Sequence, residues 1–260
     1  MPIYYSCAQR SAEWFLLRLG KPTASDFHRI VTPKGKLSAQ SRDYCCMLLA
    51  EQMLGRSLAD QNPRTEWMER GERLEEGAIK AYSMLREVEV QPGGFVTDSD
   101  GRYGCSPDGL TNDGGVEMKI PAPNTHVGYL LNPDSLREEK GPQVQGSMLV
   151  CDREHWDLVS YHEEMPPVIV RVKRDDPYVQ TLRESLDAFC DTLEVARAKL
   201  EAMYGKFPEP KIFDPGAKCD SCRATYESVL IGAPCQCGGT IVAKGDPGSL
   251  GIVPADLEVL

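Results

Sequence analysis

The stretch Tyr103–Pro121, YGCSPDGLTNDGGVEMKIP, decides the fold and carries the chemistry of this chain. It belongs to a longer segment, residues 88–121, whose short apolar runs, broken by glycine and Asp/Asn clusters, are typical of a short β-meander. Glu117 and Lys119 stand two residues apart, so on a strand they project to the same face. A turn over residues 112–115 folds the strand of Asp108 back beside them. We therefore expect two carboxylates and one ammonium group to converge at one place on a sheet.

This combination of side chains predicts a metal-dependent site. Mg²⁺ and Mn²⁺ keep most of their waters and bind through one or two carboxylates together with substrate phosphate oxygens. Asp108 and Glu117 are therefore candidate ligands of a catalytic metal. Lys119 is a candidate to hold or deprotonate an attacking water, or to stabilise charge on a phosphate. A hairpin that merely exposes these side chains to solvent is the alternative that the spacing leaves open.

The flanking segments predict helices before and after these strands. Helical spacing and capping patterns predict helices over residues 11–20, from Thr23, and over 38–54, 63–85, 142–150 and 177–204, with further strands over 155–162 and 167–174. Helices around a block of strands predict the α/β class, with a mixed central β-sheet flanked by helices. Residues 205–217 are rich in proline and glycine, so we expect one domain over 1–204 and a linker over 205–217.

The distribution of charge matters more than its sum. A net charge of −10 argues against a nucleic-acid partner, because Lys and Arg supply much of the affinity for phosphate. Residues 1–42, however, carry seven basic and two acidic side chains, a local charge of +5 that leaves −15 elsewhere. This asymmetry fits a protein that grips DNA on one surface, and a solvated helical face is the alternative.

The chain shows no targeting or membrane signal in its sequence. No apolar run approaches the roughly 18 residues that a bilayer span needs. The start also lacks the basic and apolar segments of a secretory signal. The expected localisation is cytoplasmic, with no membrane partner.

Four of the ten cysteines cluster near the C-terminus and predict a metal site of a different kind. Cys219, Cys222, Cys235 and Cys237 resemble the ligands of a zinc ribbon, which closes a tetrahedral structural Zn²⁺ site. We expect a zinc-ribbon-like module over residues 218–243 and a tail over 244–260 that docks on another subunit. Unligated thiols or a redox pair are the alternative, because C-x-C departs from the usual C-x2-C. The other six cysteines are interpreted as small buried hydrophobes.

The chain also resembles a known class of nucleases. Pro107-Asp108 and Glu117-Met118-Lys119 match the signature of PD-(D/E)XK nucleases, which have a restriction-endonuclease-like fold. Over roughly residues 11–165 the chain resembles the lambda exonuclease family, also called YqaJ-type viral recombinases. Four blocks carry this resemblance: WFLLRLG at 14–20 with TAS at 23–25, RGERLE at 70–75, the stretch 103–121, and QVQGSM at 143–148.

The resemblance implies a phosphate-binding group of residues. Arg18 and Ser25, from the first block, would contact phosphate near the 5′ end of the strand being cut. Ser106, from the third block, would add a phosphate hydrogen bond. A solvated helix residue remains the alternative for Arg18.

Two more residues receive catalytic roles by resemblance. Glu75, the last residue of the second block, would bind the metals together with Asp108 and Glu117. Gln145, in the fourth block, is preferred over its neighbours to orient water or phosphate near the catalytic centre. A surface glutamate is the alternative for Glu75, and a side chain that bridges to a neighbouring strand is the alternative for Gln145.

The resemblance further implies an activity and partners. A family member is expected to digest linear double-stranded DNA in the 5′-to-3′ direction and to leave 3′ single-stranded tails for an annealing protein. Members commonly form a trimeric ring around DNA. Two rival hypotheses remain open: an endonuclease of the same fold that cuts branched or specific DNA, and a non-enzymatic scaffold that binds DNA through the zinc ribbon.

Overall fold

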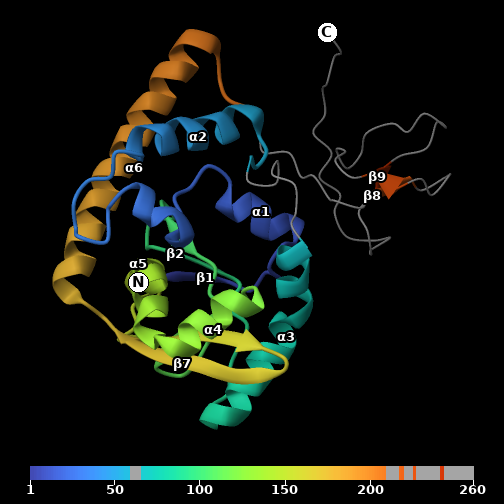
Figure 1. Cartoon of the computed structure of the whole chain (residues 1–260). Coiled ribbons are helices and arrows are strands. Elements are labelled where there is room, and N and C mark those ends of the chain that lie inside the picture. Colours follow the sequence, from blue (N-terminus) through green and yellow to red (C-terminus); the bar gives the residue numbers. More distant parts are fainter. Residues whose placement is uncertain (59–65, 209–216, 220–224, 227–240, 243–260) are drawn as a thin grey trace.

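A mixed four-stranded sheet forms the base of the molecule (Figure 1). The computed structural model describes residues 1–58, 66–208, 217–219, 225–226 and 241–242. The strands of this sheet are β4 (Gly109–Leu110), β5 (Gly114–Lys119), β6 (His155–His162) and β7 (Met165–Lys173), in that order. β5 and β6 pair in parallel, whereas the β4–β5 and β6–β7 pairs are antiparallel. The expected mixed α/β architecture is therefore present.

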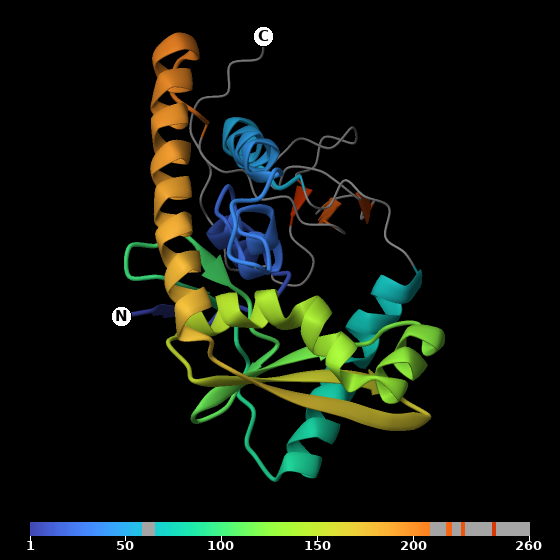
Figure 2. The ribbon, with the colours of Figure 1, turned by 60° about the vertical axis from the view of Figure 1, so that its left-hand side comes forward.

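Helices cover both faces of the sheet (Figure 2). On one face, α3 (Glu66–Arg86) packs Ala78 and Tyr82 against Val116, Met118 and Val159. On the other face lie α4 (Pro123–Leu131) and α5 (Pro133–Cys151). Because both faces are covered, five of the six residues of β5 are buried, including Glu117. A charged side chain is thus forced into the interior of the protein.

The long helix α5 is the centre of the fold. Val144 and Met148 are fully buried and belong to the same core as Trp156 and Leu158 of β6. Gly146 faces the other way, where a Cβ atom would lie 2.6 Å from the Phe27 ring. The close approach of α5 to the N-terminal segment therefore requires a glycine at this position.

A second sheet and further helices come from residues 3–54, 95–105 and 176–204. This sheet is antiparallel and contains β1 (Ile3–Tyr5), β2 (Phe95–Thr97) and β3 (Gly104–Cys105). The remaining elements here are α1 (Ala12–Arg18), the 3-10 helix η1 (Ala24–Arg29), α2 (Ser41–Leu54) and α6 (Asp176–Tyr204). The expected single β-meander is therefore wrong, since its strands belong to two sheets.

Several predicted boundaries also change. Residues 88–91, expected to form a strand, make only one isolated bridge, between Gln91 and Leu110. Thr23 precedes a 3-10 helix and makes no capping bond with its side chain, whose hydroxyl instead meets Arg18 and Ser25. Helix α5 starts at Pro133 and continues through Pro142, which the sequence analysis took as its start.

A buried ion-pair network fixes α3 to the sheet. Asp157 of β6 is fully buried, and its carboxylate accepts hydrogen bonds from Tyr82 Oη at 2.8 Å and from Arg171 at 2.8 and 3.0 Å. Arg86 adds an ion pair at 3.5 Å. Burial works against ionisation of Asp157, but these partners lower its pKa. Tyr82 lies about two turns after Glu75, so the network also holds the helix that carries that carboxylate.

The C-terminal region is described only as backbone strands. β8 (Ala217–Cys219), β9 (Thr225–Tyr226) and β10 (Ile241–Val242) form a separate antiparallel sheet in the order β10-β8-β9. Cys222, Cys235, Cys237 and the Cys219 side chain lie outside the described residues. The zinc-ribbon module and the linker therefore remain predictions. Among the described helices, none has the length and apolar character of a membrane span.

Candidate active site

The β4–β5 hairpin brings together the three residues of the sequence signature. Gly109 pairs with Val116 and Leu110 with Gly115, which sets Asp108 beside the middle of β5. Asp108 Oδ2 accepts a hydrogen bond of 2.7 Å from the Met118 backbone N–H. Lys119 Nζ donates to Glu117 Oε1 at 2.5 Å, as expected for side chains on one face of a strand.

The carboxylates of Asp108 and Glu117 repel each other. Burial raises the pKa of Asp108 well above its usual range, and the charges of Glu117 and Glu75 raise it further. For Lys119, burial alone lowers the pKa, but Glu117 and Asp108 together raise it above the ordinary value. The amine is therefore held as a cation in this state, and Asp108 binds a proton more readily than an isolated carboxylate.

Gln143, rather than Gln145, is the glutamine at this centre. Gln143 Nε2 donates to Glu117 Oε1 at 2.7 Å, and its amide oxygen lies 3.4 Å from Lys119 Nζ. Gln145 lies about 200° further round the helix and faces away. Its amide donates to Lys173 O at 2.8 Å and accepts from Asp175 N at 2.9 Å. The prediction that Gln145 lies at the catalytic centre was wrong. This residue instead links β7 to the start of α6.

Glu75 lies near the pair but is engaged elsewhere. Its Oε2 atom is 3.4 Å from Arg10 Nη2, and its charge still contributes to the raised pKa of Asp108. Within the described ranges, no three His, Cys, Asp or Glu side chains are arranged to hold a metal ion. Asp108 and Glu117 thus form the acidic centre, and Glu75 stands beside it.

This acidic centre nevertheless fits a divalent cation. The donors are hard oxygens, which suit Mg²⁺ or Mn²⁺. Asp108 Oδ1 and Glu117 Oε2 accept no hydrogen bond from any described residue, so each carboxylate keeps one oxygen for a cation. The mutual repulsion that raises the pKa of Asp108 is also what a positive charge would relieve.

A group of phosphate-binding character adjoins the acidic centre. Arg18 Nη1 donates to Ser106 Oγ at 2.9 Å, and its guanidinium stacks on the Trp14 ring at 4.2 Å. Trp14 Nε1 also donates to Ser106 Oγ, and Thr23 Oγ1 joins Arg18 to Ser25. Burial lowers the pKa of Arg18, so a nearby anion would stabilise its charge.

Acidic and basic groups line one cavity of about 180 Å³. Its walls include Asp108, Glu117 and Gln143 on one hand, and Arg10, Arg18, Ser25 and Ser106 on the other. The sequence analysis named most of these residues but missed Gln143 and Arg10. Gln143 sits four residues before Ser147, which also lines the cavity, and this i, i+4 polar pair was the available signal.

The position of Arg18 is fixed from the neighbouring helix α2. The Gly20 backbone N–H donates to Glu51 Oε2 at 3.1 Å, and Gln52 Nε2 donates to Gly20 O at 2.9 Å. Gly20 has φ of +62°, which a glycine adopts without strain. This two-sided clamp holds the turn that directly follows the arginine.

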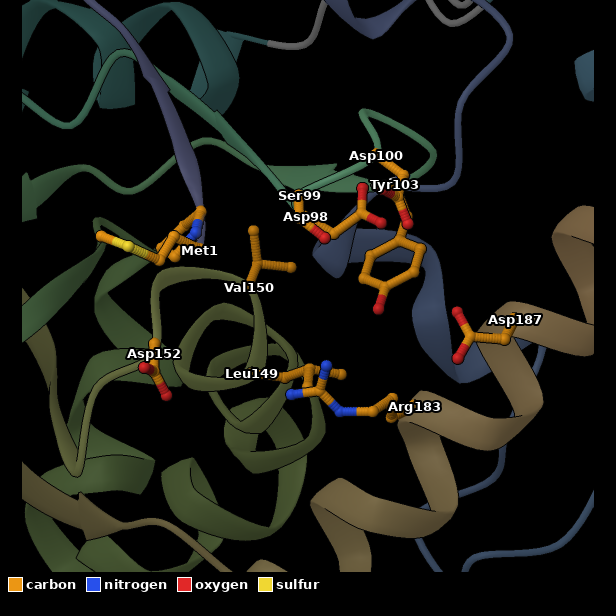
Figure 3. A pocket seen from close by; sticks show the side chains of 11 residues that line it. Met1, Asp98, Ser99, Asp100, Tyr103, Leu149, Val150, Asp152, Arg183 and Asp187 are labelled. Carbon is orange, nitrogen blue, oxygen red and sulfur yellow. Dashed lines mark hydrogen bonds between the residues drawn. The ribbon is translucent and has the colours of Figure 1, made fainter.

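A second cavity, of about 230 Å³, has a different character (Figure 3). Its lining includes four aspartates, Asp98, Asp100, Asp152 and Asp187, against one arginine, Arg183. Burial, the largest effect, raises the pKa of Asp187. Excess negative charge disfavours a phosphate ligand, so the cavity around Asp108 is the better candidate for DNA.

The chain is similar to known proteins in sequence and in structure. The model of the family described as the YqaJ-like viral recombinase domain matches residues 13–154, which include β5 and Gln143. No curated protein matches the sequence.

Solved structures supply the other similarity. LHK-Exo in complex with dAMP superposes with a TM-score of 0.65 and 28% identity, over 74% of this chain and 97% of that chain. The structure of this alkaline exonuclease from Laribacter hongkongensis gives 0.63 and 27% over the same shares. A phage-related exonuclease from Haemophilus somnus 129PT gives 0.56 and 16%, over 69% and 96%, and supports the fold alone. The family match spans more than half of the sequence, and the chain belongs to the YqaJ-like viral recombinase family.

Proposed function

We propose that this protein is a phage-type recombination exonuclease that uses Mg²⁺ or Mn²⁺ to digest linear double-stranded DNA. One observation carries the proposal: a single cavity combines two carboxylates, Asp108 and the buried Glu117, with a glutamine and a serine-bound arginine, and Lys119 donates to one of these carboxylates. Family membership and the similarity to an alkaline exonuclease support the same activity.

Different side chains of the site would have different roles in phosphodiester hydrolysis. Asp108 and Glu117 would hold the cation, and Glu75 would reach it from the adjoining helix. A divalent cation in this place lowers the pKa of a bound water and offsets charge on the departing oxygen. Lys119 and Gln143 share Glu117 Oε1 as a partner, so both are placed to orient a water beside that carboxylate. Arg18 and Ser106 would hold a phosphate of the strand.

The bonding of Arg18 favours end-directed digestion. Arg18 is held by Ser106, Thr23 and Trp14 together, which fixes its guanidinium for one phosphate rather than for a sliding backbone. A 5′-phosphate bound there would orient the first phosphodiester toward Asp108 and Glu117 and give 5′-to-3′ polarity. The dAMP bound to LHK-Exo fits mononucleotides as products.

The assembly and partners belong to the same proposal. A homotrimeric ring would place the basic N-terminal surface toward DNA, and an annealing protein would receive the 3′ tail. The cysteines at positions 219, 222, 235 and 237 would hold a structural Zn²⁺.

An end-labelled duplex assay tests the activity. Linear DNA with or without a 5′-phosphate is incubated with wild type and Lys119→Ala, in Mg²⁺ or in EDTA. We expect wild type to release mononucleotides only in Mg²⁺, and faster from the phosphorylated end. Lys119→Ala should lose this release. Equal digestion by both proteins would remove Lys119 from the mechanism.

Covalently closed circular DNA separates the rival functions. Cleavage of the circle would favour an endonuclease, and binding of duplex without any hydrolysis in Mg²⁺ or Mn²⁺ would favour a scaffold.

A further inference from the structure

A strained residue stands at the rim of the candidate active site. Arg10 lies in the loop between β1 and α1 and has φ of +64°, in the left-handed region that favours glycine. The loop is held on both sides of it: Gln9 Nε2 donates to Pro107 O at 2.8 Å, and Ser11 N donates to Ala8 O at 3.1 Å. Strained residues of this kind cluster at functional sites.

The Arg10 side chain reaches the acidic centre. Its Nη2 atom is 3.4 Å from Glu75 Oε2, and it lines the cavity that contains Asp108 and Ser106. The side chain is 42% exposed, and that of Glu75 is 24% exposed. The Arg10 side chain is therefore partly exposed to solvent where it lines the cavity, so a ligand that enters the cavity can contact it.

We propose that Arg10 is a DNA-contacting residue, whose guanidinium binds a backbone phosphate of the strand in the cavity. This inference rests on the proposed function. A phosphate that approaches three carboxylates is repelled, and a cation at the rim on the side of Glu75 offsets this repulsion. A guanidinium has five N–H donors, so it can hold Glu75 and a phosphate oxygen at once.

A rival explanation gives Arg10 a purely structural role. In that case its charge only holds Glu75 in place, and DNA never touches it. The two explanations differ in the salt dependence of DNA binding, because only a phosphate contact releases counterions from DNA.

Arg10→Gly provides a clean variant because it removes the guanidinium and suits the left-handed backbone. Arg10→Gln tests the charge with a similar side-chain length. Arg197→Gln is the matched control, since Arg197 also pairs with a glutamate, at 3.1 Å from Glu201, and has a similar exposure of 49%. Each full-length variant is titrated with a 5′-phosphorylated duplex in Ca²⁺ at several salt concentrations, and gels verify that the DNA stays intact.

We expect both Arg10 variants to bind the duplex about tenfold more weakly at 0.1 M salt, the loss typical of one charged hydrogen bond. The slope of log K against log salt should fall by about 0.9, the value for one phosphate contact. Arg197→Gln should match wild type, and the melting temperature of Arg10→Gly should equal or exceed that of wild type.

Two results would overturn the inference. One is wild-type affinity and slope in both Arg10 variants. The other is a higher Ca²⁺ requirement with an unchanged slope, which would assign Arg10 to the positioning of Glu75. Wild-type digestion of the same duplex in Mg²⁺ is measured in parallel. Its absence, with the Arg10 effect present, would reject the nuclease proposal and leave the phosphate contact in place.

Discussion

Asp108→Asn should make the metal-free protein more stable while it abolishes catalysis. Asp108 is half-buried beside Glu117, and burial together with the charge of Glu117 raises the pKa of Asp108. Asparagine keeps an oxygen that accepts the bond from Met118 N and removes the negative charge. Relief of this kind is worth about 1 kcal/mol, which corresponds to a rise in melting temperature of about 2–4 °C for a chain of this size.

In Mg²⁺, wild type should become more stable than Asp108→Asn. At ten times its dissociation constant a ligand adds about 1.4 kcal/mol to the stability of the protein that binds it. Wild type should gain this amount in Mg²⁺, and Asp108→Asn should gain little because one metal ligand is lost. Turnover should fall about a thousandfold or more, since metal-derived stabilisation of a transition state is worth several kcal/mol, here about 4.

Differential scanning calorimetry in EDTA and in Mg²⁺, across pH, checks the reasoning. A carboxyl whose folded pKa is raised destabilises the native state as the pH rises from its unfolded value, about 3.9, through its folded value. The advantage of Asp108→Asn should therefore be absent in acid, grow over that window and then stay constant. A variant less stable than wild type in EDTA at neutral pH, or one that Mg²⁺ stabilises equally, would refute this account.

Three further predictions follow from neighbouring contacts. Gln143→Ala should lower kcat by about 10²-fold with little change in melting temperature, whereas Gln145→Ala should mainly lower the melting temperature; the reverse pattern, by steady-state kinetics and calorimetry, would restore Gln145 to the centre. Asp157→Ala should cost about 2 kcal/mol or more in urea unfolding, because it leaves the buried Tyr82 hydroxyl without its acceptor and two arginines without their anion. The Mg²⁺ concentration for half-maximal activity should fall as the pH rises through the pKa of Asp108, because the cation displaces a proton there; a flat profile would exclude this coupling.

The sequence predicted the elements whose chemistry is local. The period-two spacing of Glu117 and Lys119 and the glycine-rich turn before them were sufficient to place Asp108 beside β5. The main helices were found because their apolar residues recur along one face. Arg18 and Ser106, which are 88 positions apart, were instead chosen by resemblance to the motifs of the family.

The errors arise where long-range packing decides. Residues 143 and 145 are both polar positions on one helix, and only the packing of α5 between two sheets determines which one faces Glu117. Pro142 resembled a helix start, although packing on both sides keeps it inside α5. No local pattern singles out Arg10, because its importance comes from a backbone conformation and a partner 65 residues away.

The clamp on Gly20 has a consequence for how such an enzyme adapts. Two side chains of α2 hold both backbone polar groups of Gly20, and Arg18, the arginine proposed to bind DNA, stands two positions earlier. Substitutions at Glu51 or Gln52 would therefore change the affinity for strand ends, although neither residue lines the cavity. Natural variation in end preference among relatives should be sought in such supporting positions as well as in the cavity wall.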